Sequence, residues 1–376
     1  MPQRVAIVGA GWTGAVTARL LDEGGVSVEV FERAAVVGGH SRVETINGVV
    51  YEPNGAHIFH TSDEEVAAFV KRFGMGRPYE HKVLTEVFLS DDDDEAWMLS
   101  WPPQVAELEA LPIWSQIARE LSELPPEPHG DDFATFAVSL MGPTLYRLFI
   151  EGYTVKQWGR QPSELSSRFA PKRIDLRRDG NRRLFRDRYE FFEAEGVNEV
   201  IGAVLADVPV TCGVTILADD LPELARRFDA VVITAPLDDF LGRSGELEWR
   251  GITMRSTYHP VDDEGATRTP AYVVNRPSLR VPYTRTVETK HATGQRAPGT
   301  VVSEEYPGAP ARHYPVPTVD RVNERRNAEL KAEIEAGAPL PVLFAGRLAN
   351  YLYINQDEAI SQGMACADRT AALLAR

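Results

Sequence analysis

Residues 4–32 carry the pattern that most narrowly limits how this chain can fold. The run "RVAIV" is a continuous apolar strand of the kind that a parallel sheet buries on both faces. A turn with Gly9, Gly11 and Gly14 follows, then a helical pattern, and then a second strand that ends at Glu32. The glycines let the backbone approach a pyrophosphate at the helix N-terminus, and the acid can accept hydrogen bonds from a ribose hydroxyl. The order predicts a Rossmann-like dinucleotide-binding domain.

A second pair of glycines helps to decide whether the dinucleotide is FAD or NAD. The stretch "RAAVVGGHS" places Gly38 and Gly39 just beyond the second strand. A flexible loop at that point can pass under the phosphate and ribityl chain of a flavin, and enzymes that bind only NAD rarely carry it. The sequence therefore favours FAD over NAD.

Length and charge narrow the class of protein further. A chain of 376 residues is expected to form two or three domains. The net charge of −15 argues against nucleic acid and anionic membranes as partners. The two cysteines, Cys212 and Cys366, fit a reducing compartment. The chain starts directly into a strand and has no apolar run near the roughly 20 residues that span a bilayer, so we expect a cytoplasmic protein.

The segment "NGAHIFHT" at residues 54–61 carries two histidines, His57 and His60. No third His, Cys or carboxylate falls at ligand spacing, so no metal site is predicted. Two interpretations stay open. The segment can be a buried turn whose imidazoles bond backbone groups, or one imidazole can lie against a flavin ring and tune the charge of its reduced form.

Several motifs together resemble those of the UDP-galactopyranose mutase family, and they follow one another along nearly the whole chain. They are "GGH", "GAHIFHT", "FIEGYTVKQW", "PYTRTVETKH", "HYPV" and "GRLANYLYINQD". The resemblance implies a flavoenzyme without net redox change, in which N5 of the reduced flavin attacks the anomeric carbon of a nucleotide sugar. The sugar, held as an adduct, opens and recloses between its pyranose and furanose forms. It also implies NAD(P)H or another reductant, and a possible homodimer.

The resemblance assigns roles to individual residues. The implied catalytic residues are His57, His60 and Arg347. The implied cofactor-binding residues are Gly9, Gly11, Gly14, Glu32, Arg33, Gly38, Gly39, His40 and Arg347. The implied substrate-binding residues are Phe149, Tyr153, Trp158, Arg177, Arg285, His313, Tyr353 and Asn355. In this reading the aromatics hold the nucleobase and sugar, and the planar guanidinium groups hold the diphosphate.

The sequence departs from the family pattern at four positions. Leu184 stands where the family has a tyrosine that touches the diphosphate, and Val197 replaces another tyrosine. His313 replaces the first tyrosine of "YYPV" and could restore a phosphate contact as a cation. Asn355 replaces an aspartate. These changes indicate either another nucleotide sugar, such as a UDP- or TDP-linked deoxyhexose, or drift within an ordinary UDP-galactopyranose mutase.

The expected fold class is α/β, with a Rossmann-like FAD-binding domain, a helical domain and an antiparallel β-sheet domain. Residues 1–62, 196–245 and 318–376 are expected to form the FAD domain. Residues 63–165 are expected to be helical, interrupted by an acidic hairpin tip at residues 90–95. Residues 166–195 and 246–317 are expected to form the antiparallel sheet that floors the ligand site.

Two other functions share part of this evidence. An FAD-dependent oxidoreductase of the amine-oxidase type has the same N-terminal pattern, but it has no use for Arg177 and Arg285 facing a diphosphate. A non-catalytic sugar-nucleotide binder could keep the fold, but it would not need intact His57, His60 and Arg347.

Overall fold

The computed structural model describes residues 3–90, 92–172, 174–193 and 195–376. A five-stranded sheet holds the start of the chain, and every neighbouring pair of its strands is parallel. Its strands, in spatial order, are β15 (Val342–Phe344), β10 (Ala230–Ile233), β1 (Arg4–Val8), β2 (Ser27–Glu32) and β9 (Val210–Cys212). This is the predicted Rossmann-like sheet, completed by strands from residues 196–245 and 318–376.

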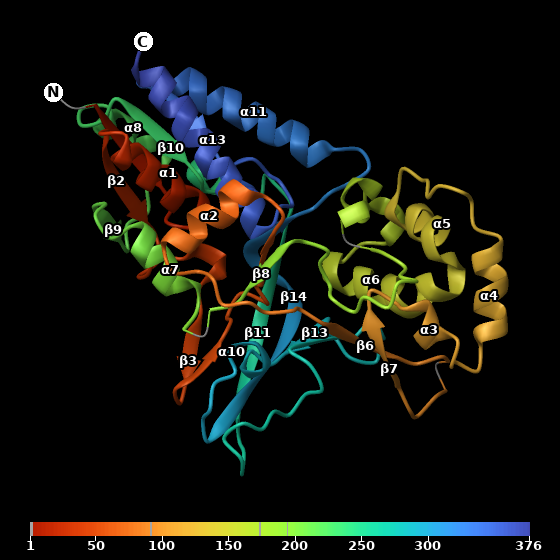
Figure 1. Cartoon of the computed structure of the whole chain (residues 1–376). Helices are drawn as coiled ribbons and strands as arrows, with labels where there is room; N and C mark the ends of the chain where they lie inside the picture. Colours follow the sequence, from red (N-terminus) through yellow and green to blue (C-terminus); the bar gives the residue numbers. More distant parts are fainter. Residues whose placement is uncertain (1–2, 91, 173, 194) are drawn as a thin grey trace.

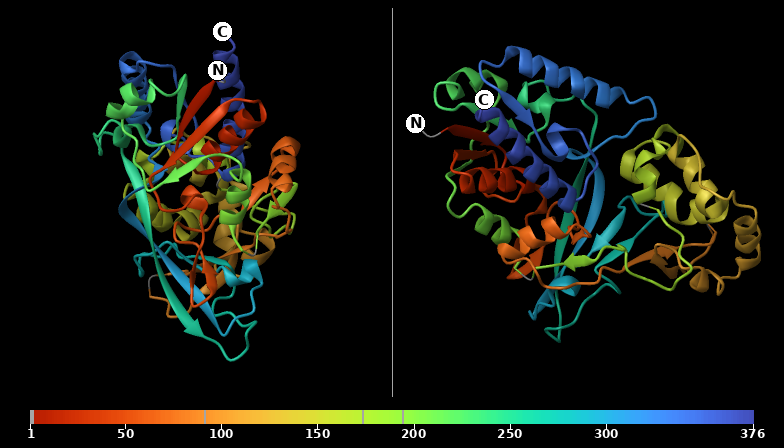
Figure 2. Two further views of the ribbon diagram at one scale, coloured as in Figure 1. Left: turned by 90° about the vertical axis from the view of Figure 1, so that its left-hand side faces the viewer. Right: turned by 45° about the horizontal axis from the view of Figure 1, so that its top comes forward.

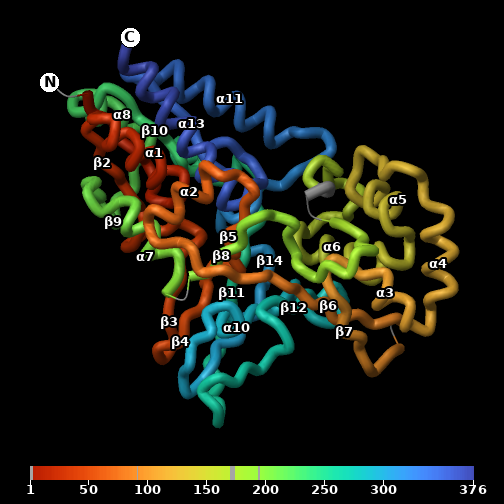
Figure 3. Tube along the Cα trace, in the orientation of Figure 1, coloured from red at the N-terminus to blue at the C-terminus, as the bar shows by residue number. Residues whose placement is uncertain are grey.

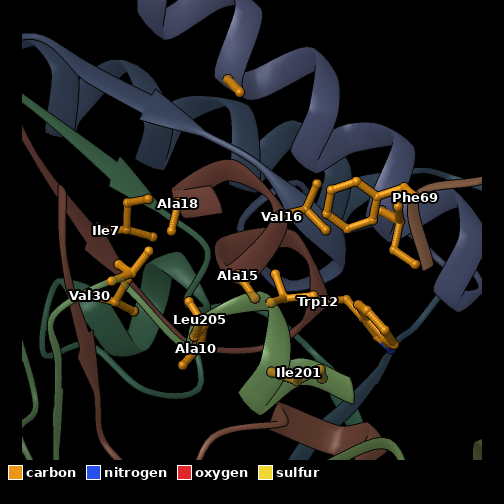
Figure 4. Close-up of a cluster of buried hydrophobic side chains, with 14 of the residues drawn as sticks. Ile7, Ala10, Trp12, Ala15, Val16, Ala18, Val30, Phe69, Ile201 and Leu205 are labelled. Atoms are coloured by element: carbon orange, nitrogen blue, oxygen red, sulfur yellow. The ribbon is translucent and has the colours of Figure 1, made fainter. Parts of the chain in front are cut away.

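Helices cover both faces of this sheet, so the apolar strand β1 is buried on both sides. Val5 and Ile7 join one core cluster, and Ala6 and Val8 join another. The first face packs against α1 (Trp12–Glu23), α2 (Glu64–Arg72), α7 (Val197–Val204) and α13 (Gln356–Leu374). The second face packs against α8 (Leu221–Leu224), α9 (Leu237–Phe240) and α11 (Val322–Gly337). Figure 4 shows Val16 of α1 beside Phe69 of α2.

A second, six-stranded sheet forms the middle of the molecule. Its strands, in spatial order, are β11 (Trp249–Pro260), β14 (Gly299–Pro315), β13 (Arg285–Val287), β12 (Val273–Asn275), β6 (Val83–Val87) and β7 (Trp97–Trp101). The long strands β11 and β14 run side by side below the parallel sheet (Figures 1 and 2). The sheet is mixed rather than purely antiparallel, because β6 pairs in parallel with β12.

Residues 63–165, expected to be helical, also contribute β6 and β7 to this sheet. The two strands form an antiparallel hairpin around the predicted acidic tip, of which the structure describes all but residue 91. In "VLTEV" the buried and half-buried residues alternate, which is the strand period that the surrounding helical patterns conceal. The helices of this region are α3 (Val105–Leu108), α4 (Trp114–Ser122), α5 (Phe133–Leu145), a π-helical turn (Tyr146–Glu151) and α6 (Gly152–Trp158) (Figure 3).

The stretch Phe133–Trp158 is long and apolar enough to cross a membrane, although no such run was expected. It serves here as a core helix, since 56% of its most apolar window is buried inside the fold. A kink at Gly142, with φ of 82°, and Pro143 break its regularity. Its apolar side chains instead pack with Leu99, Leu165 and Val316 from other parts of the chain.

Short elements join the large ones. The pair β5 (Phe59–Thr61) and β8 (Tyr189–Phe191) is antiparallel, as is the pair β3 (Glu44–Ile46) and β4 (Val49–Tyr51). Two short α-helices are α10 (Lys290–Thr293) and α12 (Gly346–Ala349). The 3₁₀ turns are Gly39–Ser41, Pro162–Glu164, Ser167–Lys172 and Ala218–Asp220. The two chain ends lie close together, as Gln3 donates to the carbonyl of Leu374 (Figure 1).

Candidate active site

A cavity of about 800 Å³ opens beside the carboxyl ends of the parallel strands and the start of α1. This volume lies in the range of cavities that hold a cofactor or a ligand of similar size. Many of the residues that the sequence singled out line it together: Gly9, Gly11, Gly14, Glu32, Arg33, Gly38, Gly39, His40, His57, His313, Arg347 and Asn355. We call it the dinucleotide cavity.

Three glycines of this cavity, Gly9, Gly14 and Gly39, leave little or no space for side chains. Gly9 has φ of +109°, which an L-residue rarely adopts. A Cβ on Gly14 would lie 1.9 Å from the carbonyl oxygen of Gly9, so α1 and the turn touch backbone to backbone. A Cβ on Gly39 would come within 3.1 Å of the Cα of Gly11. The two glycine runs therefore pack against each other and present bare backbone to the ligand.

Glu32 is held at the end of β2 by backbone donors. Its Oε2 accepts from the N–H of Ala10 at 2.7 Å, and its Oε1 accepts from the N–H of Ala34 at 2.8 Å. The buried carboxylate is thereby fixed beside the glycine turn, and its remaining lone pairs can accept from a ribose. Arg33, by contrast, is more than half exposed and lies 4.0 Å from Asp239.

Three imidazoles and one guanidinium gather at one end of this cavity, where each influences the pKa of its neighbours. The rings of His40 and His313 stack with centroids 4.5 Å apart. Burial, and then the positive charge of Arg347, lowers the pKa of His57 to about 3 and that of His313 to about 4. Burial, then His313 and Arg347, also holds the pKa of His40 well below its ordinary value. The three rings are thus neutral near pH 7, and Arg347 carries the positive charge of this end.

His313 lies in the dinucleotide cavity rather than at the expected phosphate end. Its Nδ1 accepts from the N–H of Ile252 at 3.3 Å, so the proton of the neutral ring is on Nε2. A ring that is buried and neutral supplies a hydrogen-bond donor but no cation. Its role as a cationic phosphate donor stays a prediction.

His57 combines both interpretations of its segment. Its Nδ1 lies 2.6 Å from the carbonyl oxygen of Gly55, and since a carbonyl only accepts, Nδ1 carries the proton. Its backbone N–H donates to Glu52 at 2.8 Å. Burial raises the pKa of Glu52 to about 7, and Tyr272 donates to the same carboxyl group. These hydrogen bonds fit the interpretation of the segment as a buried turn. The ring also lines the dinucleotide cavity, as the interpretation with a flavin requires.

A second cavity, of about 730 Å³, lies between the helical region and the mixed sheet. We call it the substrate cavity. It collects the other residues that the sequence singled out: His60, Phe149, Tyr153, Trp158, Arg177, Arg285, Tyr353 and Asn355. Asn355, the N-cap of α13, lines both cavities, so they adjoin at this residue.

Aromatic side chains form one wall of the substrate cavity. Trp158 is 6% exposed, and its ring centroid lies 5.8 Å from that of Tyr353 and 6.2 Å from that of Tyr314. The ring of Phe149 lies 6.1 Å from that of Trp101. Flat apolar rings of this kind can hold a nucleobase or the face of a sugar.

Lys156, between these aromatics in sequence, serves the fold instead. Its Nζ donates to the carbonyls of Ser278, Val281 and Tyr283, at 2.7, 3.2 and 2.9 Å, and to that of Arg276. Burial lowers its pKa to about 8. The ammonium group thereby fixes residues 276–283 against α6.

The arginines of the substrate cavity differ in how many bonds they make to other protein groups. Arg285 pairs with the buried Glu305, with Nε and Nη2 2.8 and 2.6 Å from Oε2. Arg177 is 3% exposed, and its guanidinium bonds Asp175 and the carbonyls of residues 181, 183 and 184. Arg177 thus braces its own loop in this conformation. Arg186 lines the same cavity with 54% of its side chain exposed.

Sequence reasoning missed several residues of both cavities. Arg186 and Asp187 line the substrate cavity. They follow Leu184 in the same loop, and this closeness in sequence to a predicted ligand contact could have identified them. His81, whose pKa burial lowers to about 3, and Asp357 also line the substrate cavity. Gln356 lines the dinucleotide cavity, where it accepts from the indole N–H of Trp12 at 2.7 Å.

Comparisons with known proteins agree with this geometry. The model of the UDP-galactopyranose mutase family matches residues 148–353, and that of an NAD(P)-binding Rossmann-like domain matches residues 7–73. The chain is 28% identical to a probable UDP-galactopyranose mutase of Klebsiella pneumoniae, covering 97% of this chain and 94% of that one. It is 25% identical to a dTDP-fucopyranose mutase of Escherichia coli, covering 97% of each. Its fold is similar to that of a reduced UDP-galactopyranose mutase, with a TM-score of 0.77 at 15% identity, over 99% of this chain and 96% of that one.

Proposed function

Since this chain belongs to the UDP-galactopyranose mutase family, we propose that it interconverts the pyranose and furanose forms of a nucleoside-diphosphate sugar with reduced FAD. The observation that carries the proposal is the pair of cavities that adjoin at Asn355. One presents bare glycine backbone and a fixed acid, which suit a dinucleotide. The other presents aromatic rings and arginines, which suit a nucleobase and a diphosphate.

The dinucleotide cavity fits FAD. The glycine runs would let a pyrophosphate approach the backbone closely, and Glu32 beside them would accept from a ribose. Arg347 and the neutral rings of His40, His57 and His313, which line the same cavity, would surround the flavin ring. A fixed positive charge there favours an anionic reduced flavin. When bound and reduced, the flavin supplies a nucleophilic nitrogen for the anomeric carbon of the sugar.

The chain's own residues bind and orient the substrate. The rings of Phe149, Tyr153 and Trp158 provide the wall for the nucleobase and sugar, and Arg285 provides a guanidinium for the diphosphate. NAD(P)H is the reductant we propose. A cytoplasmic location agrees with the free Cys212 and Cys366, since reducing conditions preserve thiols.

We expect a deoxyhexose nucleotide such as dTDP-fucose to be used with about tenfold or greater kcat/KM than UDP-galactose. The expectation rests on Leu184 and Asn355, the two departures from the family pattern that line the substrate cavity. Leu184 packs with an apolar cluster that includes Ile58 and Tyr272 and offers no hydrogen bond from its side chain. Initial rates of furanose formation by the reduced protein, measured for both sugars, test this directly.

The variant Leu184→Tyr restores a hydroxyl at this position and should shift the ratio toward UDP-galactose. Val197→Tyr restores the other missing tyrosine but lies in α7, in the core beside the parallel sheet, and its effect on the ratio should be small by comparison. A native chain that clearly prefers UDP-galactose would instead be an ordinary UDP-galactopyranose mutase with tolerated substitutions.

A further inference from the structure

An imidazole and a carboxylate form a tight pair on the wall of the substrate cavity. The Nδ1 atom of His60 lies 2.7 Å from Oδ2 of Asp187. Because a carboxylate only accepts, Nδ1 carries the proton, and in the neutral ring Nε2 is the atom that can accept one. Both residues line the substrate cavity, and His60 is 8% exposed.

Three contacts fix the pair. The antiparallel pairing of β5 and β8 places His60 opposite Glu190, which brings the loop before β8 to the imidazole. The hydroxyl of Ser62 donates to Oδ1 of Asp187 at 2.8 Å, so both carboxylate oxygens are engaged. The ring of Phe185 stacks on the imidazole with centroids 3.5 Å apart and planes 12° apart. The imidazole is therefore held in one orientation by groups from two elements.

The pair lies near the junction of the two cavities. Asn355 lines both of them, and Asp357, two residues farther along α13, lines the substrate cavity. Burial raises the pKa of Asp357, and the next largest influence on that pKa is His60, so the two groups face each other. The charged and titratable groups that face the imidazole are Asp187 from the loop before β8, Asp357 from α13, and His81 from the segment before β6.

The proposed reaction, on which this inference rests, requires a proton to change oxygen. In the pyranose, the oxygen on C5 is bonded to the anomeric carbon and the oxygen on C4 is a hydroxyl. In the furanose, these roles are exchanged. The oxygen that leaves the anomeric carbon must therefore gain a proton, and the hydroxyl that replaces it must lose one. No electrons are gained or lost in this exchange.

We propose that His60 carries this proton between the two sugar oxygens and that Asp187 is its positioning residue. In the furanose direction, Nε2 of the protonated ring gives its proton to the C5 oxygen as the bond from that oxygen to the anomeric carbon breaks. The same nitrogen then accepts the proton of the C4 hydroxyl as its oxygen bonds to the anomeric carbon, so the ring ends in the form in which it began. Asp187 keeps the other ring nitrogen protonated and stabilises the imidazolium while the proton is held, as a carboxylate does beside a catalytic histidine.

The test compares His60→Gln and Asp187→Asn with the native holoenzyme. We expect His60→Gln to lower kcat by about 100- to 10,000-fold. Asp187→Asn should lower kcat less and move the basic limb of the pH–rate profile to lower pH, because the proton-donating imidazolium loses its carboxylate. The dissociation constant of UDP, the flavin content and the melting temperature should all stay near native. The matched control is His291→Gln, since His291 lies 3.6 Å from Glu288 but lines neither cavity.

Rescue separates proton transfer from a structural role. Added imidazole should restore part of the kcat of His60→Ala and none of that of an Arg285 variant. A kcat unchanged in both Asp187→Asn and His60→Gln overturns the role, and so does a loss of kcat matched by an equal loss of UDP binding or flavin. If the native chain itself forms no furanose, the proposed function fails. If the native chain is active and both variants match it, only the role of His60 and Asp187 fails.

Discussion

Gly14→Ala is expected to yield a chain without bound flavin, whereas the native protein should be yellow with a stoichiometric flavin. The new methyl group would lie 1.9 Å from the carbonyl oxygen of Gly9 and 3.4 Å from Ile7. That carbonyl belongs to the turn that joins β1 to α1, so the conflict is relieved only if the helix moves off the strand. Overpacking of this kind costs about 1–3 kcal/mol or more, and here it also displaces the backbone that faces the pyrophosphate.

The matched control is Gly202→Ala, another glycine within a helix. Apart from its chain neighbours and the backbone of its own helix, no atom lies within 4 Å of the Cβ it would gain, so this change in α7 should keep the flavin. It should also stabilise the protein by about 0.5–1 kcal/mol, because alanine favours a helix more than glycine does. The absorbance ratio at the flavin and protein bands and the melting temperature measure both effects. Full flavin content in Gly14→Ala would show that the pyrophosphate does not rest on this turn.

Arg285→Ala is expected to weaken binding of UDP and dTDP by about 2–5 kcal/mol, or roughly 30- to 5,000-fold. The guanidinium lies on β13 in the substrate cavity, where it would face a buried diphosphate. The same change also removes the partner of Glu305, whose side chain is 1% exposed. Part of any loss could therefore come from a destabilised fold, because a buried carboxylate without a partner is costly.

A double variant separates the two effects. Arg285→Met with Glu305→Gln leaves no buried charge, so its melting temperature should stay closer to native than that of Arg285→Ala. Its nucleotide affinity should stay as low as that of the single variant. Arg227→Ala breaks a surface pair with Glu29 outside both cavities and serves as the control. Calorimetric titration measures the affinities. Native affinity in the double variant would place the diphosphate elsewhere.

The parts of this molecule that are local in sequence could be predicted from it. The strand, glycine turn, helix and acid of residues 4–32 are adjacent in sequence, and β1 pairs directly with β2 while Glu32 accepts from Ala10, so their spacing was enough to predict this part of the backbone. The residues to which the resemblance assigned site roles were likewise predicted to face ligands, and the structure places all of them along the two adjoining cavities.

The remaining features depend on contacts between residues far apart in the chain. His60 and Asp187 are separated by 127 positions and meet only because β5 pairs with β8. Lys156 reads as part of a ligand motif, yet it bonds carbonyls more than a hundred residues away. His313 could be recognised as a substitution, but which cavity it lines depends on the placement of β14, which pairs with β11 and brings this ring against His40. Spacing carries no information about such pairings.

The central claim is a rearrangement catalysed by a reduced cofactor without net redox change. The measurement that tests it most directly starts with protein reduced once by dithionite, freed of excess reductant and kept without oxygen. Mixed with a large excess of UDP-galactose or dTDP-fucose, it should form many equivalents of the furanose per flavin, detected by chromatography and NMR, while the flavin stays reduced. The air-oxidised protein should form none. Product limited to one equivalent per flavin, or equal turnover in both redox states, would contradict the account and favour an oxidoreductase of the amine-oxidase type or a simple binder.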